Sequence, residues 1–178
     1  MTTLVLFLLF CQMLGAFTGA FTAIWAELVY IYAMRPPATP AHAGRAGDGK
    51  IDSAERAHIN IITHGLRFGM TLLLLASLAL IVIAYVLNVV MQPALTASYW
   101  IFMTLALLII GLSWALARHY LSFSLGSAAT LSAWWLLAYA TLGQLPISFG
   151  AAIALYIVLT AVLFVVLHSI RLLAQKIK

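Results

Sequence analysis

The chain has 178 residues, of which 65% are hydrophobic and 7% are charged, and its mean hydropathy is +1.12. Soluble proteins average about 25% charged residues, so this composition excludes a soluble globular protein. The net charge of +5 does not indicate nucleic-acid binding, because basic residues that flank apolar runs are explained by membrane topology and anionic lipids.

Five apolar runs follow one another along the chain, at about 3–34, 61–91, 98–117, 122–142 and 148–170. Each is long enough for a helix that crosses a bilayer core, which takes roughly 20 residues. The sequence therefore predicts an all-α, polytopic membrane protein, with five transmembrane helices in one bundle and a single domain over 1–178.

Apart from Arg67, which lies within the second run, lysine and arginine occur only in alternate breaks between these runs and after the last one. Arg35, Arg45, Lys50 and Arg56 lie in the first break, Arg118 in the third, and Arg171, Lys176 and Lys178 after the last run. The N-terminus and the second and fourth breaks carry none. Because short basic loops stay in the cytoplasm, the N-terminus is expected outside and the C-terminus inside.

The first run also contains the only cysteine, Cys11. The run has no basic residue before it and is too long for a cleaved signal sequence, so we expect Cys11 to lie within a span. A single cysteine excludes an intramolecular disulfide, a CxxC redox pair and a zinc site built on several cysteines.

The loop 35–60 is expected in the cytoplasm. Pro36, Pro37 and Pro40 end the first helix, whereas Asp52 and Glu55 have the spacing of a capping box. A helix is therefore predicted to start near Ser53 and to run unbroken into the second span.

The segment Asp48 to Glu55 also matches the second half of an EF-hand loop. The first half would place Gly44 and Ala46 at ligand positions, and neither offers a side-chain oxygen for calcium. We interpret the segment as a turn followed by a helix cap.

Small residues recur every four positions in the first span, and the series Cys11, Gly15, Gly19, Ala23 ends at the acid Glu27. Such a stripe, which includes a GxxxG pattern, packs against protein, so Glu27 is expected to face the bundle. The second span begins with a similar pair, Gly65 and Gly69. It also carries His64, Arg67 and Thr71 at helical spacing.

Glu27 and Arg67 are predicted to pair, because each lies about eight residues inside its span in adjacent antiparallel helices. A buried pair of this kind can fix the register of two helices or can belong to a functional site, and both interpretations remain open. Arg67 can also reach the headgroups with its long side chain.

Three histidines, His64, His119 and His168, are expected at one level near the cytoplasmic side. Imidazoles at similar depth on facing helices are the usual axial ligands of haem b in a bundle, so these three are the candidate cofactor-binding residues. Interfacial histidines at helix ends are the alternative. No HxxxH or HExxH spacing occurs, so no metal site is assigned, and His42 and His58 are expected to be solvated.

Other activities lack their residues. Every lysine is outside the apolar runs, which excludes a retinal Schiff base, and nothing supports a hydrolase or a phosphotransferase. Trp134, Trp135 and Tyr139 could stack on a planar ligand, although paired tryptophans more often pack in the core or anchor at the interface.

Three groups of residues carry a resemblance to known proteins. They are Leu14-Gly15-Ala16, the turn from Asp48-Gly49-Lys50-Ile51 to Glu55, and Leu125-Gly126 before Ser132-Ala133-Trp134-Trp135. In this order the chain resembles a set of uncharacterised small bacterial membrane proteins with five spans. It is more distantly similar to the copper-resistance-D and membrane protoporphyrinogen-oxidase superfamily, some of whose members bind haem b. That superfamily commonly has a histidine where this chain has Gln12, so no haem ligand is carried over.

The sequence thus predicts a multi-pass protein of the bacterial inner membrane with a polar site in the cytoplasmic leaflet. A haem b or metal-binding, redox-associated role is the first hypothesis, with the cofactor itself unknown. The alternatives are a non-catalytic subunit or assembly factor of a membrane complex, or a small transporter. Its partners would be the lipid bilayer and another membrane protein or a second copy of the chain. Whether the protein is an enzyme is left open.

Overall fold

The structure is a computed structural model, and it describes residues 2–33, 53–87, 96–143 and 148–176. All regular elements in these segments are helical: α1 (Thr2–Ala33), α2 (Ser53–Gly65), the π-helical turn η2 (Leu66–Met70), α3 (Thr71–Val86), α4 (Ala97–Ala117), α5 (Phe123–Thr141) and α6 (Phe149–Lys176). The predicted turn at Asp48–Lys50, the cap residue Asp52 and His42 lie outside the described residues.

Four stretches of helix are long and apolar enough to cross a membrane. They are Thr3–Tyr32, Arg56–Val86, Ala97–Ala117 and Phe149–Ala174. The chain is therefore a multi-pass membrane protein. The expected fifth span at 122–142 is not among these four helices, because it is not apolar enough.

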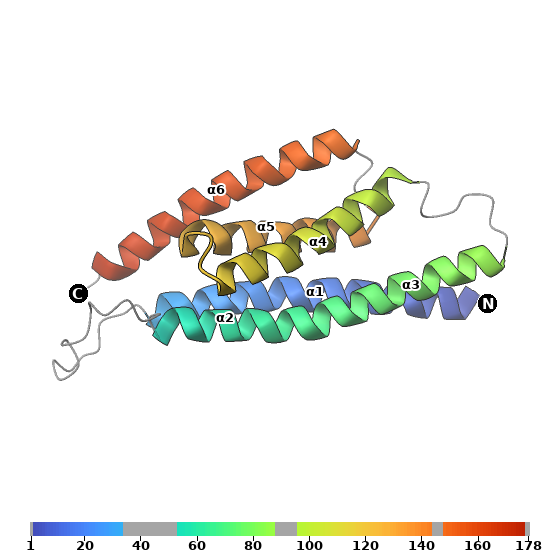
Figure 1. Ribbon diagram of the computed structural model, residues 1–178, viewed down its shortest axis with the longest axis horizontal. Helices are drawn as coiled ribbons and strands as arrows, with labels where there is room; N and C mark the ends of the chain where they lie inside the picture. The colour runs from blue at the N-terminus through green and yellow to red at the C-terminus, as the bar shows by residue number, and fades with distance from the viewer. Residues whose placement is uncertain (1, 34–52, 88–95, 144–147, 177–178) are drawn as a thin grey trace.

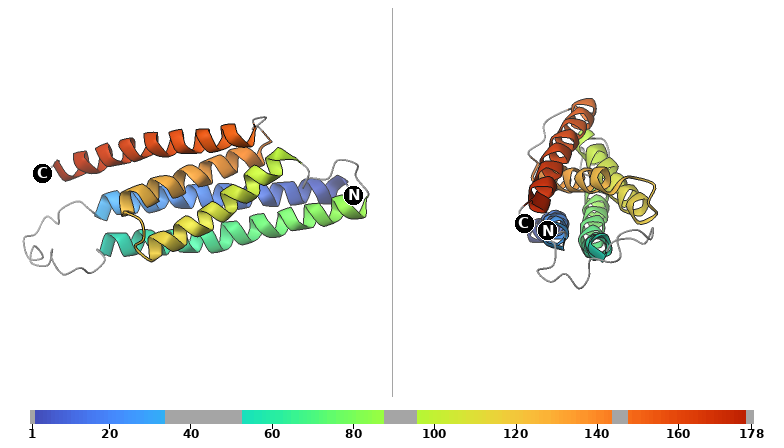
Figure 2. Two further views of the ribbon diagram at one scale, coloured as in Figure 1. Left: turned by 45° about the horizontal axis from the view of Figure 1, so that its top comes forward. Right: turned by 90° about the vertical axis from the view of Figure 1, so that its left-hand side faces the viewer.

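The helix in question, α5, carries Ser124, Ser127, Thr130 and Ser132 among small residues, which lowers its hydropathy. These polar groups are tolerated because α5 packs against α1, α4 and α6 and is buried on most sides. Figure 2 shows α5 in end view between these helices. Its buried hydroxyls bond within the helix, Thr130 to the carbonyl of Gly126 at 2.8 Å and Ser132 to that of Ala128 at 2.7 Å.

The elements α2, η2 and α3 form one continuous rod that lies alongside α1 (Figure 1). The rod begins at Ser53, where the sequence places its start, and the residues that flank η2 are helical. The π-turn itself was not expected. It contains Arg67 and Gly69, and π-turns inside α-helices often accompany functional sites.

Glycines set the spacing between α1 and this rod. A Cβ atom on Gly15 would lie 2.7 Å from the carbonyl oxygen of Gly69, and one on Gly65 would overlap Thr22. The two backbones therefore approach closely at these positions. The contacts also define the antiparallel register, in which Gly15 lies level with Gly69 and Thr22 with Gly65.

The last helix, α6, packs mainly against α5 and to a lesser extent against α4, and most of its surface is exposed apolar side chain. At the left-hand end of Figure 1, its C-terminal half lies at the same end of the bundle as the end of α1 and the starts of α2 and α5. Four helices thus bring residues together at one end of the bundle.

Candidate functional site

Arg171 of α6 lies at the centre of a buried polar cluster at this end. Its Nη2 donates hydrogen bonds to Glu27 Oε2 of α1 and to Ser127 Oγ of α5, both at 2.7 Å. Its Nη1 donates to Ser124 Oγ at 3.1 Å. Arg171 and Glu27 are 6% and 4% exposed, so the ion pair between them is nearly dry. One guanidinium therefore joins α6 to both α1 and α5.

Two aromatic rings flank the guanidinium. The Cζ atom of Arg171 lies 4.9 Å from the ring centroid of Tyr30 and 5.4 Å from that of Phe123. These are cation–π distances, and such contacts gain strength where water is excluded. The rings contact each other, with centroids 4.4 Å apart, and so cover one side of the ion pair.

His58 of α2 is the third charged or titratable member of the cluster. Its side chain is fully buried, and Nε2 lies 3.7 Å from Glu27 Oε1, which is too long for a hydrogen bond. Its ring meets Phe123 edge-on with centroids 4.8 Å apart. Neither ring nitrogen of His58, nor Glu27 Oε1, has a hydrogen-bond partner within the described segments. His58 and Glu27 Oε1 are therefore buried polar groups whose hydrogen-bonding capacity the described residues leave unused.

The expected solvation of His58 is wrong, and its cause is the register of the helices. Counting from the contact between Thr22 and Gly65, residue 27 of α1 lies level with about residue 60 of α2. His58 is on the face of α2 that also buries Ile62 and Gly65 against α1. The segment before the second apolar run is thus part of the bundle.

The same register corrects the predicted pairing of Glu27 with Arg67. Arg67 is exposed, and it lies two residues from the buried Gly65 and Gly69, on the opposite side of the helix. It is also about seven residues, or roughly 10 Å, further along the rod than the level of Glu27. The partner of Glu27 in the structure is Arg171.

The three histidines proposed as haem ligands are all exposed and lie on separate parts of the bundle. His64 Nδ1 is 2.8 Å from the carbonyl oxygen of Asn60, His119 sits in the turn after α4 with φ of 58°, and His168 stacks on Phe164. In the described part of the chain, no three histidine, cysteine, aspartate or glutamate side chains gather closely enough to hold a metal ion.

The tryptophan pair of α5 takes part in packing. Trp134 is 1% exposed and lies against Gly19 of α1, where a Cβ atom would overlap its ring. Trp135 meets Phe21 edge-on, with ring centroids 6.2 Å apart. The close approach of α1 and α5 thus depends on a glycine opposite a tryptophan.

Sequence reasoning found Glu27 but missed Arg171, His58 and the two serines. Arg171 was interpreted only as a topological charge after the last span. The serines Ser124 and Ser127 stand three residues apart, and so lie on one face of α5. The buried acid expected on α1 was the available signal for a cation, because a buried charge needs a partner.

Comparisons of the chain with protein-family models, with curated proteins and with solved structures find no significant match. The resemblance to small bacterial five-span proteins and to the copper-resistance-D superfamily therefore stays a prediction from the motifs quoted above.

The cluster predicts a strong energetic coupling between Glu27 and Arg171. Glu27→Gln or Arg171→Gln alone should lower the free energy of unfolding by about 3 kcal/mol, because each leaves a buried charge without its counter-ion. The double variant should recover about 1–3 kcal/mol of the summed loss. Unfolding of the purified protein in mixed detergent micelles measures all three.

Arg67→Gln is the matched control, since it removes an arginine that does not contact Glu27. Its loss should add to that of Glu27→Gln within about 0.5 kcal/mol. Coupling of Glu27 to Arg67 but not to Arg171 would contradict the site described here.

Proposed function

We propose that this chain is a five-span protein of the bacterial cytoplasmic membrane, with its N-terminus outside, that serves as a non-catalytic subunit of a membrane complex. The partner would dock on the exposed face of α2 and η2. Two features support the proposal: the way α5 is enclosed in the bundle, and two exposed stripes of opposite polarity at the same end.

The fifth span is proposed for α5. Its 19 residues correspond to about 28 Å of helix, close to the thickness of a bilayer core. It lies between α4 and α6, both apolar enough to cross a membrane, and these neighbours shield its serines and threonines from lipid. With five crossings, Arg118 and Arg171 fall on the same side, which the positive-inside rule assigns to the cytoplasm.

The observation that carries the subunit role is a polar stripe on the rod. It consists of Arg56, Asn60, His64, Arg67 and Thr71, all exposed, at spacings of four, four, three and four residues. Residues at such spacings share one face of a helix. This face points away from α1, which contacts the opposite side of the rod.

An apolar stripe lies at the same level on α1. Phe21, Trp25, Leu28 and Tyr32 also follow helical spacing, and their exposed fractions run from 53% to 75%. In the register set by the glycines, Phe21 is level with about residue 66 of the rod and Tyr32 with about residue 55. The two stripes therefore occupy the same depth in the membrane.

One depth cannot suit both stripes. If lipid surrounds this end, the aromatic and aliphatic side chains of α1 are well placed, but the guanidinium of Arg67 must either face hydrocarbon, which is costly, or extend along the rod to the headgroups. If water surrounds it, the α1 stripe is an exposed apolar patch of the kind that marks interaction sites. A second protein that covers the polar stripe removes the conflict and leaves the α1 stripe to lipid.

Charge decides the chemistry of the partner. The polar stripe carries two arginines and no acid, so a partner helix with carboxylate side chains is complementary. A second copy of the chain related by a two-fold axis would place arginines opposite arginines. We therefore propose a different, acidic membrane protein.

The proposed topology predicts which positions can be labelled from each side. In a Cys11→Ala background, single cysteines at Ala46 and Lys178 should react with a membrane-impermeant maleimide only after the cytoplasmic face is opened. One at Gln92 should react in intact cells. Labelling of Ala46 and Gln92 from the same side would contradict five crossings with this orientation.

The subunit role predicts that the protein migrates as a complex in mild detergent extracts of its native membrane. Arg67→Glu, which repels an acidic partner, should shift it to the mobility of the free chain. Arg118→Glu reverses an exposed charge outside the stripe and should leave the complex intact.

Native electrophoresis followed by mass analysis of the complex checks both variants. A free chain in the wild-type extract, or a complex that survives Arg67→Glu, would contradict docking on the polar stripe. A complex made only of copies of this chain would replace the acidic partner by self-association.

A further inference from the structure

A cavity of about 410 Å³ lies between α1, α3, α4 and α5, at the end of the bundle opposite to Arg171. Its walls are mainly aliphatic and aromatic, with Leu9, Leu80 and Phe102 among them. This volume falls in the usual range of small-molecule sites, roughly 300–1,000 Å³.

None of the described side chains that line the cavity is charged. Removing a charge from water into such surroundings is costly when no counter-ion is present. The cavity therefore suits a neutral molecule, and its position within the helices of a membrane protein suits one that is soluble in lipid.

Ser77 of α3 gives the cavity a specific polar feature. The residue is 7% exposed, and its hydroxyl has no hydrogen-bond partner within the described segments. Other buried hydroxyls of the bundle, such as those of Thr130 and Ser132, donate to a carbonyl one turn earlier. A buried polar group without a partner is costly, so the hydroxyl of Ser77 is a donor available to an occupant of the cavity.

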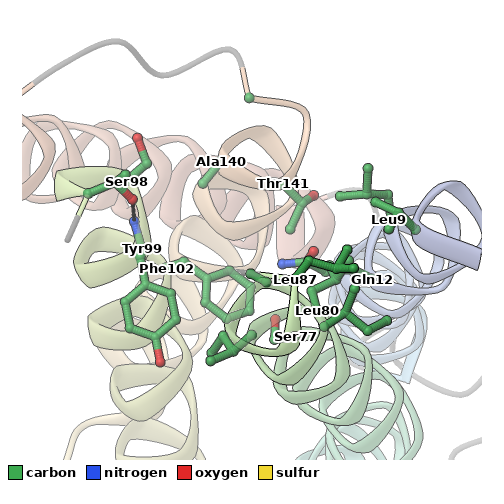
Figure 3. A pocket seen from close by; sticks show the side chains of 16 residues that line it. Leu9, Gln12, Ser77, Leu80, Leu87, Ser98, Tyr99, Phe102, Ala140 and Thr141 are labelled. Carbon is green, nitrogen blue, oxygen red and sulfur yellow. Dashed lines mark hydrogen bonds between the residues drawn. The ribbon is translucent and has the colours of Figure 1, made fainter. Parts of the chain in front are cut away.

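Gln12 of α1 provides a second donor. Figure 3 shows the side chains of Gln12, Ser77 and Phe102 turned toward the space between the helices. The amide of Gln12 carries two N–H donors. Thr141, which also lines the cavity, already donates its hydroxyl to the carbonyl of Ala138 at 2.7 Å.

We propose that this cavity binds a neutral, lipid-soluble molecule that places a carbonyl oxygen between Ser77 and Gln12. The oxygen accepts hydrogen bonds from the hydroxyl and the amide, while the apolar body of the molecule fills the space between α3 and α4. Two kinds of membrane molecule carry such an oxygen, the ring of an isoprenoid quinone and the ester of an acyl lipid. The proposal does not depend on the subunit role, because it concerns the other end of the bundle.

Binding to the full chain in detergent tests the proposal with three probes. Decylubiquinone represents the quinone, dioctanoylglycerol represents the ester, and decylbenzene is a carbonyl-free compound of similar shape. The rise in melting temperature with probe concentration gives the dissociation constant. At least one of the two carbonyl compounds should bind more tightly than decylbenzene, and the one that does identifies the kind of oxygen.

Variants locate the binding. Ser77→Ala should weaken binding of the carbonyl compound about five- to tenfold, as expected for the loss of one hydrogen bond, without lowering the stability of the free protein. Ser113→Ala is the matched control, since its buried hydroxyl on α4 also lacks a partner in the described chain but does not line the cavity. It should leave binding unchanged. Ala84→Phe, which fills the cavity, should abolish it.

Equal affinity for decylbenzene and for both carbonyl compounds would overturn the proposal, because the cavity would then select only an apolar shape. The same holds if Ser77→Ala and Ala84→Phe bind the carbonyl compound as well as the wild type does, since binding would then lie elsewhere.

Discussion

The buried ion pair between Glu27 and Arg171 is the interaction on which the arrangement of this bundle depends. Along most of its length α6 contacts only α5 and α4, and its other sides are exposed. Arg171 joins it to α1 through Glu27, at a distance of 2.7 Å. A charge in a low-dielectric interior is tolerated only when a partner and hydrogen bonds compensate its desolvation, so each member confines the other to one geometry.

That geometry in turn requires close helix packing. Gly15, Gly19 and Gly69 allow the backbones to approach, and the resulting register brings His58 beside Glu27. The serines of α5 then complete the hydrogen bonds of the guanidinium, which lets α5 retain polar side chains inside the bundle. The polar cluster therefore depends on the small residues that set the spacing and register of the helices.

Much of the helical architecture could be predicted from composition alone, because apolar runs of this length have no other stable form in a membrane. The start of the rod at Ser53 and the inward orientation of Glu27 also followed from local patterns. The partner of Glu27 did not, because depth was counted from the edges of the apolar runs, whereas the actual register is set by glycine contacts between helices. Burial of His58 and the π-turn at Arg67 depend on the same tertiary packing.

The two ends of the bundle differ in chemistry. One end holds the charged cluster and presents the polar stripe, and the other holds an uncharged cavity with the free hydroxyl of Ser77. This division is consistent with the proposed role, in which the protein would hold a partner at one end and a neutral membrane molecule at the other. The exposed positions of His64, His119 and His168 give a shared haem site less geometric support.

The distance between the side chains of Glu27 and Arg171 tests most directly whether this buried ion pair holds the bundle together. Solid-state NMR dephasing between the labelled carboxylate carbon of glutamate and the guanidinium nitrogens of arginine can measure it in lipid bilayers. Strong dephasing that disappears in Arg171→Lys and persists in Arg67→Lys is the predicted result, as it reflects the 2.7 Å contact. Dephasing that instead disappears only in Arg67→Lys, or none in the wild type, would contradict it.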